Sequence, residues 1–330
     1  MNEKLKKALG PLVGLYEDAS VQTILVDAPN QIYVEKESGM EDTELSFANG
    51  EELQDCIEKI FATVGRPASS LGPYADIRLS DGTNVKAMFP PATLANPALV
   101  IAKVVDDKPS WKDLLSWQCL DVNGLEIIDK LLVGNVPIVV AGNYGSGKTT
   151  LTSLIVDRIP QSKRVVVAEQ NAEVRLERER VLRLETTPEL PMEELLKSAV
   201  RLRPEWLVVN ELVGSETKTA LELMRTGCPI LATVNAGDVL DALARIEQMT
   251  LSSLVSLTMA DVRSIISSAV SYVVYIERLS SGARKILEIS EITGLEKERY
   301  KVRPLYRYSM DDDKFIITDK GKTLLAAASK

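Results

Sequence analysis

The segment 138–159 constrains the fold of this chain more than any other, because an apolar run, a glycine-rich loop and an apolar-faced helix follow one another there. The apolar run, 138–141, has the length and composition of a buried parallel strand. The helical stretch, 149–159, is stopped by Pro160. A buried strand followed by a tight loop and a helix is typical of a parallel sheet, so the segment predicts an α/β domain.

The loop between the strand and the helix is a complete match to the phosphate-binding pattern of nucleoside triphosphatases. Its glycines let backbone N–H groups turn inward around the α- and β-phosphates, and Lys148 places a cation near the β- and γ-oxygens. Thr149 offers a hydroxyl to Mg²⁺ at the N-terminus of a helix whose dipole favours anions. We therefore expect ATP or GTP to bind here, since a chance match in 330 residues has odds of about one in a hundred. The expected nucleotide-binding residues of this segment are Gly142, Asn143, Tyr144, Gly145, Ser146, Gly147, Lys148, Thr149 and Thr150.

Charge and hydropathy restrict the partners of the chain. Its 47 acidic and 39 basic residues give a net charge of −8, which makes nucleic acid and anionic membrane surfaces unlikely partners. The sequence contains neither a secretory signal nor an apolar run of membrane-spanning length. We expect a cytoplasmic protein without direct membrane insertion, unless a protein partner holds it at a membrane.

Two residue types limit the available chemistry. The sequence has no histidine, which excludes histidine-based triads, histidine metal sites and imidazole acid–base catalysis. Catalysis must then rely on carboxylates, lysine, arginine and bound Mg²⁺. Cys56, Cys119 and Cys228 are isolated and outside any CxxC spacing, so we expect reduced thiols rather than a disulfide or zinc framework.

The chain divides into segments of different pattern. Charge and proline interrupt the sequence at 106–113, which predicts a linker. Upstream, 1–105 predicts a small α+β domain, with a helix at 51–64. Downstream, strands and helices alternate over 114–295, which predicts a doubly wound parallel sheet with its ligand at the C-terminal ends of the strands. We expect 296–330 to be a loosely packed extension. The predicted strands of the downstream domain are 138–141, 164–169, 207–211 and 230–234, its helices are 149–159, 192–202, 217–226 and 239–249, and a hairpin joins 272–277 to 284–289.

Two acids at predicted strand ends are candidate catalytic residues. Glu211 ends an apolar strand about sixty residues after the loop, as suits an acid that holds Mg²⁺ or polarises the attacking water. Glu169 ends the preceding strand, and the sheet topology could bring it to the same cleft. The alternative for Glu211 is a solvated strand terminus, and for Glu169 a helix cap or surface acid. We expect Thr149 and Glu211 to be the metal-binding residues.

Other charged residues are as readily explained by a place on the surface as by a role in function. Arg201 and Arg203 could reach the phosphates of a neighbouring subunit, with surface salt bridges as the alternative. The alternation Glu-Arg-Glu-Arg at 177–180 predicts a solvated face.

Several further motifs follow one another in an order and spacing that a known family shares: AEQNAEV, VLRLET, AVRLRPEWLVVNELVG, LMRTG, DALARIEQM, SSAVSYVV and IERLSSGARKILEISEI. With GNYGSGKTT before them, they resemble the type II/IV secretion ATPases, most closely the CpaF-like branch that drives tight-adherence (Flp/Tad) pili. VQTILVDAPNQIYVE and ADIRLSDGTNVKAMFPP also resemble the N-terminal domain of that family. The resemblance covers about residues 18–295.

The resemblance implies a two-domain protomer with a RecA-like motor domain. It implies a hexameric ring of this chain on the cytoplasmic face of the inner membrane, in contact with platform proteins of a secretion or pilus machine. It further implies that Mg²⁺-ATP hydrolysis moves pilin or another protein. Lys148, Glu211 and Glu169 are then the expected catalytic residues, and Arg78 is an expected nucleotide-binding residue from the N-terminal domain.

This chain departs from the family pattern at several positions. Members typically carry an acid after the residue matching Glu169, a glycine before the residue matching Glu211, an arginine two residues after it, and a Leu-His-Ala box. The corresponding residues here are Gln170, Asn210, Val213 and Val234-Asn235-Ala236.

The N-terminal domain differs as well. The phosphate-facing arginines of the family map onto Asn84 and Ala102, while Arg78 and Lys103 remain as basic residues nearby. Loss of cations that neutralise the leaving phosphate can lower the rate by about 10³-fold, so the changes affect hydrolysis more than binding.

Two hypotheses from different classes remain open. The first is a working secretion motor, in which Lys148 holds the phosphates and Glu211 with Glu169 orients the attacking water. The second is a nucleotide-binding structural or regulatory ring subunit with little turnover. A RecA-like nucleic-acid translocase is disfavoured by the acidic net charge and by the absence of interleaved basic and aromatic residues.

Overall fold

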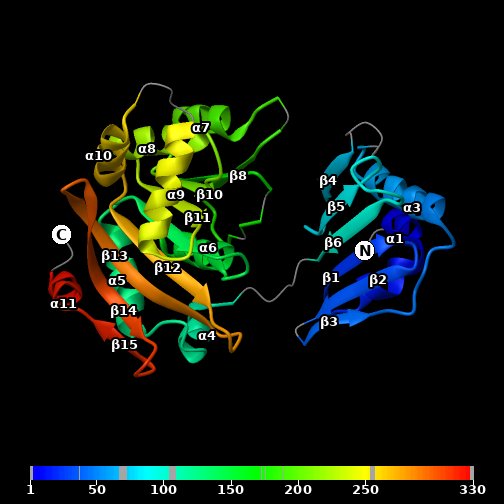
Figure 1. The fold of residues 1–330 in the computed structure, drawn as a ribbon, viewed down its shortest axis with the longest axis horizontal. Coiled ribbons are helices and arrows are strands. Elements are labelled where there is room, and N and C mark those ends of the chain that lie inside the picture. The colour runs from blue at the N-terminus through cyan, green and yellow to red at the C-terminus, as the bar shows by residue number, and fades with distance from the viewer. Residues whose placement is uncertain are drawn as a thin grey trace. The chain divides into compact units, whose positions relative to one another are not determined.

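The structure, a computed structural model, describes residues 3–36, 38–66, 73–103, 109–171, 173–174, 176–187, 189–252 and 257–327. The chain divides into two compact units, Met1–Asp107 and Lys108–Lys330 (Figure 1). Of the expected linker 106–113, residues 106–108 lie outside the described part, and a helix begins at Trp111 with Ser110 as its N-cap.

The first unit is an antiparallel six-stranded sheet with helices packed against it. The strands lie in the order β3-β2-β1-β6-β5-β4. The expected helix is present, and four apolar side chains at helical spacing, Leu53, Ile57, Ile60 and Phe61, are fully buried in the core of this unit. Its elements are α1 (Glu3–Leu9), η1 (Gly10–Leu12), α2 (Val13–Glu17), β1 (Val21–Ala28), β2 (Gln31–Lys36), β3 (Gly39–Asp42), α3 (Gly50–Ala62), β4 (Tyr74–Arg78), β5 (Asn84–Met88) and β6 (Ala98–Ala102).

The second unit is built on a nine-stranded sheet in the order β15-β14-β13-β12-β7-β11-β10-β8-β9. Strands β12, β7, β11, β10, β8 and β9 run parallel, and β13, β14 and β15 continue the sheet antiparallel from β12. These strands are β7 (Ile138–Gly142), β8 (Val165–Glu169), β9 (Val181–Glu185), β10 (Trp206–Asn210), β11 (Ile230–Asn235), β12 (Tyr272–Arg278), β13 (Arg284–Glu296), β14 (Arg299–Ser309) and β15 (Lys314–Ile317). The predicted α/β fold with a parallel sheet is therefore confirmed.

Helices cover both faces of this sheet (Figure 1). Because successive strand residues point to opposite faces, Val139 and Ala141 pack with the helices of one layer, whereas Ile138 and Val140 pack with those of the other. The first layer holds α7 (Met192–Arg201), α8 (Glu216–Arg225), α9 (Val239–Ser252) and α10 (Met259–Ala269). The second layer holds α4 (Trp111–Ser116), α5 (Val122–Val133), α6 (Lys148–Arg158) and α11 (Asp319–Ala326). No helix of the described ranges has the length and apolar character that crossing a membrane requires.

The expectation of a loosely packed extension after residue 295 is wrong. β14 pairs with β13 over most of its length, and α11 packs against α5. The Tyr306 side chain is fully buried, stacks on Phe315 and accepts a 3.0 Å hydrogen bond from the backbone N–H of Asp121. Charged residues alternate with the apolar ones along β14, which is the pattern of a half-buried antiparallel strand, but Pro304 interrupts the alternation.

Candidate nucleotide-binding site

The phosphate-binding loop joins β7 to α6 at the C-terminal edge of the parallel strands. Gly145 and Gly147 adopt φ angles of 73° and 97°, a left-handed region that favours glycine. At Gly142 a Cβ atom would lie 2.3 Å from the carbonyl oxygen of Ile276, so the first glycine is required by the close approach of β12. The glycines therefore have the geometric roles that the motif predicts.

Lys148 is the first residue of α6 and is largely buried. Its Nζ donates a 2.9 Å hydrogen bond to the carbonyl oxygen of Asn143 and lies 5.7 Å from the ring centroid of Tyr144. Burial lowers the pKa of the Lys148 ammonium, and the negative charge of Glu211 opposes that shift. The ammonium is thus held inside the loop, in the electrostatic field of Glu211.

Three hydroxyl groups of the loop and helix have the chemistry that a phosphate and Mg²⁺ require. The Ser146 side chain is fully buried, and its Oγ has no hydrogen-bond partner among the described residues. Thr149 and Thr150 are partly buried in the first turn of α6. A buried hydroxyl without a partner is costly unless a ligand or water satisfies it, so these residues fit an oxygen-rich ligand.

The other end of α6 is fixed by Arg178. Its guanidinium donates hydrogen bonds to the carbonyl oxygens of Val156 and Ile159 at 2.8 and 3.1 Å, and to two further carbonyls at the exit of the helix. The expectation of a solvated face at 177–180 is therefore wrong for Arg178, which is 8% exposed. The cation satisfies the free carbonyls at the C-terminus of the helix, where the dipole is negative.

Glu211 follows β10 directly and adopts a φ of 75°, which is uncommon for a residue with a side chain. Its backbone N–H donates a 2.8 Å hydrogen bond to Oγ1 of Thr233 on β11. Its carboxylate accepts a hydrogen bond from Nδ2 of Asn235 at the end of the same strand. Burial raises the pKa of the Glu211 carboxyl, whereas Lys148 lowers it and Glu173 raises it further. The turn and these bonds hold a partly buried carboxylate beside the loop.

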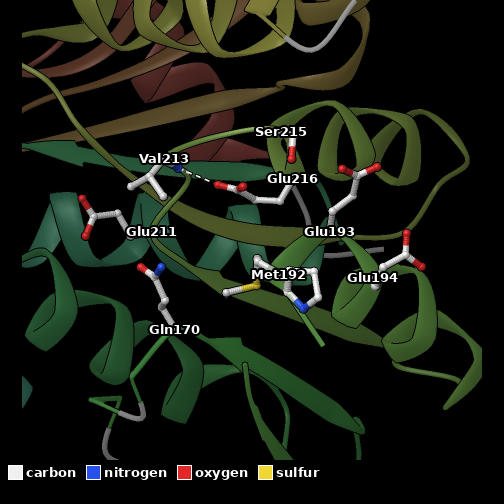
Figure 2. A pocket seen from close by; sticks show the side chains of 9 residues that line it. Gln170, Met192, Glu193, Glu194, Glu211, Val213, Ser215 and Glu216 are labelled. Atoms are coloured by element: carbon white, nitrogen blue, oxygen red, sulfur yellow. Dashed lines mark hydrogen bonds between the residues drawn. The ribbon is translucent and has the colours of Figure 1, made fainter. Parts of the chain in front are cut away.

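Glu211 lines two hollows of the surface. One has a volume of about 230 Å³ and is lined by Tyr144, Glu211, Leu212, Val213, Val234, Asn235, Arg245, Gln248 and Met249. The other has a volume of about 310 Å³ and is lined by Gln170, Pro191, Met192, Glu193, Glu194, Glu211, Val213, Ser215 and Glu216. In Figure 2, Glu211 and Gln170 lie at one end of the second hollow and the carboxylates of Glu193 and Glu194 at the other. Only the first hollow combines Glu211 with a residue of the phosphate-binding loop.

The loop after Glu211 is held by Glu216. Its Oε1 accepts a 2.6 Å hydrogen bond from the backbone N–H of Val213 (Figure 2). It also accepts a 2.7 Å hydrogen bond from the backbone N–H of Gly214. Val213, where the resemblance predicts an arginine, is 54% exposed. This position therefore presents an apolar side chain to both hollows.

Glu169 is fully buried, and both of its carboxylate oxygens are engaged. Oε1 accepts hydrogen bonds from the backbone N–H groups of Glu173 and Val174 at 2.9 and 2.7 Å, and Oε2 accepts one from Arg183 at 3.0 Å. Burial raises the pKa of this carboxyl, and these hydrogen bonds oppose the shift. Glu169 lies one strand from Glu211 and is linked to it through Asn210, but its contacts are those of a residue that fixes the segment after β8.

Arg78, Asn84 and Ala102 lie in one row of the sheet of the first unit. Arg78 pairs with Asn84, and Asn84 pairs with Ala102, so the two positions without arginine flank each other in register. Arg78 Nε donates a 3.3 Å hydrogen bond to the carbonyl oxygen of Gly82. Lys103 donates to the carbonyl oxygen of Asp18 and lies 5.8 Å from the ring centroid of Tyr16. Arg78 belongs to a different unit from the loop, so its expected contact with the nucleotide stays a prediction.

Arg201 and Arg203 precede β10 and so lie at the N-terminal edge of the parallel strands. The loop and Glu211 lie at the opposite, C-terminal edge. Within one chain these arginines are therefore remote from the loop, and their expected role toward a neighbouring subunit stays a prediction.

Sequence reasoning missed two residues that the fold brings to the site. Thr233, two residues before Asn235 on β11, accepts a hydrogen bond from the backbone N–H of Glu211. Arg284, at the start of β13, donates from Nε to the carbonyl oxygen of Gly145 at 3.3 Å. The sequence predicted the hairpin that contains Arg284. It did not show that this hairpin lies beside the loop, because that depends on the pairing of β12 with β7.

The fold and the loop define a P-loop nucleoside triphosphatase unit with a RecA-like sheet, preceded by a smaller α+β unit. Residues 6–315 match the type II/IV secretion system protein family, and the chain belongs to that family.

Individual relatives and a solved structure are also similar to this chain. The conjugal transfer protein TrbB of Rhizobium radiobacter is 30% identical over 224 residues, which cover 67% of this chain and 68% of that protein. An uncharacterized protein of Methanocaldococcus jannaschii is 26% identical over 325 residues, or 96% of this chain, but the chain spans only 58% of the length of that relative. The solved structure of the ATPase DotB of Legionella pneumophila aligns with a TM-score of 0.61 and 20% identity over 87% of this chain and 80% of that one, which supports the fold.

Proposed function

We propose that this protein is a Mg²⁺-ATP-hydrolysing motor of a type II/IV secretion or pilus machine. The observation that carries the proposal is the arrangement of Lys148 and Glu211: the two side chains influence each other's pKa, and Asn235 holds the carboxylate beside the loop. A cation for the phosphates and a carboxylate for the attacking water are the two groups that phosphoryl transfer to water requires.

The residues of the loop divide the work on the nucleotide. The backbone N–H groups around Gly145 and Gly147 and the ammonium of Lys148 bind and orient the phosphates. The hydroxyl of Thr149 and the carboxylate of Glu211 would hold Mg²⁺, which supplies neutralisation of the phosphate charge when it is bound. Within the described ranges, no group of three or more His, Cys, Asp or Glu side chains is arranged to hold a metal ion.

Glu211 has the properties of a group that accepts a proton from water or orients it. Its pKa is raised by burial, which increases its basicity relative to an exposed glutamate, and the charge of Lys148 opposes that rise. Glu169 acts in this proposal as a positioning residue, because its two oxygens hold the segment after β8.

A second candidate function is a nucleotide-binding ring subunit with little turnover. Val213 and Asn235 favour it, because they replace cationic or titratable residues of the family beside Glu211. Asn84 and Ala102 favour it as well, since neither supplies a charge toward a phosphate. Binding would then persist through the loop while hydrolysis is slow.

Steady-state and single-turnover ATP hydrolysis by the purified wild type separate these functions. The matched variants are Lys148→Ala, expected to lose nucleotide affinity, and Glu211→Gln, expected to lose at least about 10²-fold in turnover while ATP affinity stays within a few-fold. Wild-type hydrolysis no faster than that of Glu211→Gln would refute the motor and leave the structural subunit. Absence of ATP binding by folded wild type at millimolar concentration would refute both.

The assembly and partners of the motor are part of the proposal. We propose a hexameric ring of this chain, peripheral at the cytoplasmic face of the inner membrane and held there by platform proteins. Membership of the family supports this assignment. Light scattering in the presence of an ATP analogue is expected to show a hexamer or ring fragments, and a strictly monomeric protein at tens of micromolar would contradict it.

A further inference from the structure

The end of the β12–β13 hairpin lies against the phosphate-binding loop. Arg278 and Arg284 face each other across this hairpin. The Arg284 Nε lies 3.3 Å from the carbonyl oxygen of Gly145, and a Cβ atom on Gly147 would lie 3.1 Å from the Arg284 Cδ. The Arg284 side chain therefore runs along the two left-handed glycines of the loop.

Most of the hydrogen-bonding capacity of this guanidinium is unused. In the described part of the chain, the Gly145 carbonyl is the sole hydrogen-bond partner of the Arg284 side chain, and no carboxylate pairs with it. Four of its five N–H donors remain, and the residue is exposed to solvent. A guanidinium whose stem packs on backbone and whose plane is open is suited to stack on a planar ring.

Exposure separates Arg284 from the cation of the phosphate cradle. Arg284 and Lys148 each donate a hydrogen bond to a carbonyl oxygen of the loop, that of Gly145 and that of Asn143 respectively. Lys148 is largely buried in the loop, where the backbone N–H groups converge on the anion, whereas Arg284 is exposed to solvent. Lys148 is therefore the better placed of the two to neutralise the β- and γ-phosphates.

The order of strands gives the direction of the nucleotide. Arg284 reaches the loop from the β12 side of β7, whereas Glu211 and Asn235 reach it from the β11 and β10 side. If Glu211 orients the water that attacks the γ-phosphate, as proposed above, the nucleoside leaves the loop on the opposite side. That side is the one on which Arg284 lies.

We infer that Arg284 binds the nucleoside end of a purine nucleotide, with its guanidinium stacked on the base. This inference rests on the proposed nucleotide-binding function and adds a residue of the β12–β13 hairpin to the site. It makes Arg284 a determinant of affinity for ATP and ADP as against inorganic polyphosphate, since only the former carry a ring.

Calorimetric titration of ATP, ADP and inorganic tripolyphosphate tests the inference. Arg284→Ala is expected to weaken the affinity for ATP and ADP by about tenfold. Its affinity for tripolyphosphate is expected to stay within twofold of that of the wild type. Arg284→Lys keeps the charge without the plane, so it is expected to behave like Arg284→Ala. The matched control is Arg278→Ala, which removes the same charge from the facing strand and is expected to change none of the three affinities.

Three results would overturn the inference. Unchanged ATP affinity in Arg284→Ala, with the wild type binding ATP, refutes it and leaves the proposed function intact. Equal losses for ATP and tripolyphosphate, restored by Arg284→Lys, show that the residue acts as a phosphate cation instead. A wild type that binds neither ATP nor tripolyphosphate refutes the proposed function and this inference with it. Thermal unfolding of each variant identifies losses of affinity that are caused by misfolding. If Arg284→Ala does not fold, Arg284→Gln is titrated in its place.

Discussion

Truncation of Asn235 tests how the Glu211 carboxylate is positioned. Within the described residues, Asn235 Nδ2 is the only side-chain group that donates to this carboxylate, while Thr233 holds only the backbone N–H. In Asn235→Ala the backbone of Glu211 remains fixed, but its carboxylate is free to rotate. We expect slower hydrolysis with unchanged ATP binding.

The magnitude follows from the type of bond that is lost. A hydrogen bond to a charged group contributes about 1.5–3 kcal/mol, and each 1.36 kcal/mol corresponds to a factor of ten in rate. If the bond contributes fully in the transition state, the turnover of Asn235→Ala falls by about 10- to 150-fold. Stability should change little, because the buried Oδ1 of Asn235 has no partner among the described residues and its removal offsets part of the loss.

Single-turnover hydrolysis and nucleotide titration of three variants distinguish positioning from other effects. Asn235→Ala should lose turnover alone. Asn235→Asp should lose at least as much, because a second carboxylate repels Glu211 and raises its pKa. Gln248→Ala removes an amide from the same hollow without a contact to Glu211 and serves as the control. Turnover of Asn235→Ala within threefold of both the wild type and the control would refute the reasoning, as would parallel losses of affinity and turnover.

Three further predictions concern pH dependence and stability. Burial raises the pKa of Glu211, so turnover that needs its ionised form should decline on acidification at a higher pH than the ordinary glutamate value of about 4.3; a pH–rate profile that stays flat down to that value would contradict this. Glu169→Ala leaves two backbone N–H groups without their acceptor and should lower the free energy of unfolding by about 1–3 kcal/mol in urea, with ATP affinity unchanged; a loss of affinity without a loss of stability would instead favour a direct role at the nucleotide. Tyr306→Ala should lower the free energy of unfolding in urea by about 3–5 kcal/mol, whereas Arg307→Ala, at an exposed position, should lower it by less than about 1 kcal/mol. Equal losses of stability would mean that β14 is not part of the core.

The phosphate-binding loop could be predicted because its chemistry is contiguous in sequence. Backbone N–H groups, Lys148 and Thr149 act together through local geometry, and the glycines at 145 and 147 have the left-handed angles that the motif requires. The parallel sheet followed for a similar reason, since runs of buried apolar residues report strands that are covered on both faces. The resemblance to the secretion ATPases was confirmed at the level of the family, whereas the tight-adherence branch stays a prediction.

Interpretations failed where burial depends on distant partners. The charge alternation at 177–180 is typical of a solvated face, yet Arg178 is buried because the exit of α6 offers it several unpaired carbonyl oxygens. The final segment has the composition of a loose tail, yet β13 supplies an edge to which it adds strands. Neither partner can be recognised in the local sequence.

The sequence by itself determined that this chain has a phosphate-binding loop on a parallel α/β sheet, because that motif depends on residues next to one another. Only the tertiary structure decided what surrounds the loop. Asn235 meets Glu211 because β11 pairs with β10, and Arg284 meets Gly145 because β12 pairs with β7. Strand order is set by packing over the whole sheet, so contacts between the ends of different strands are not encoded in any one segment.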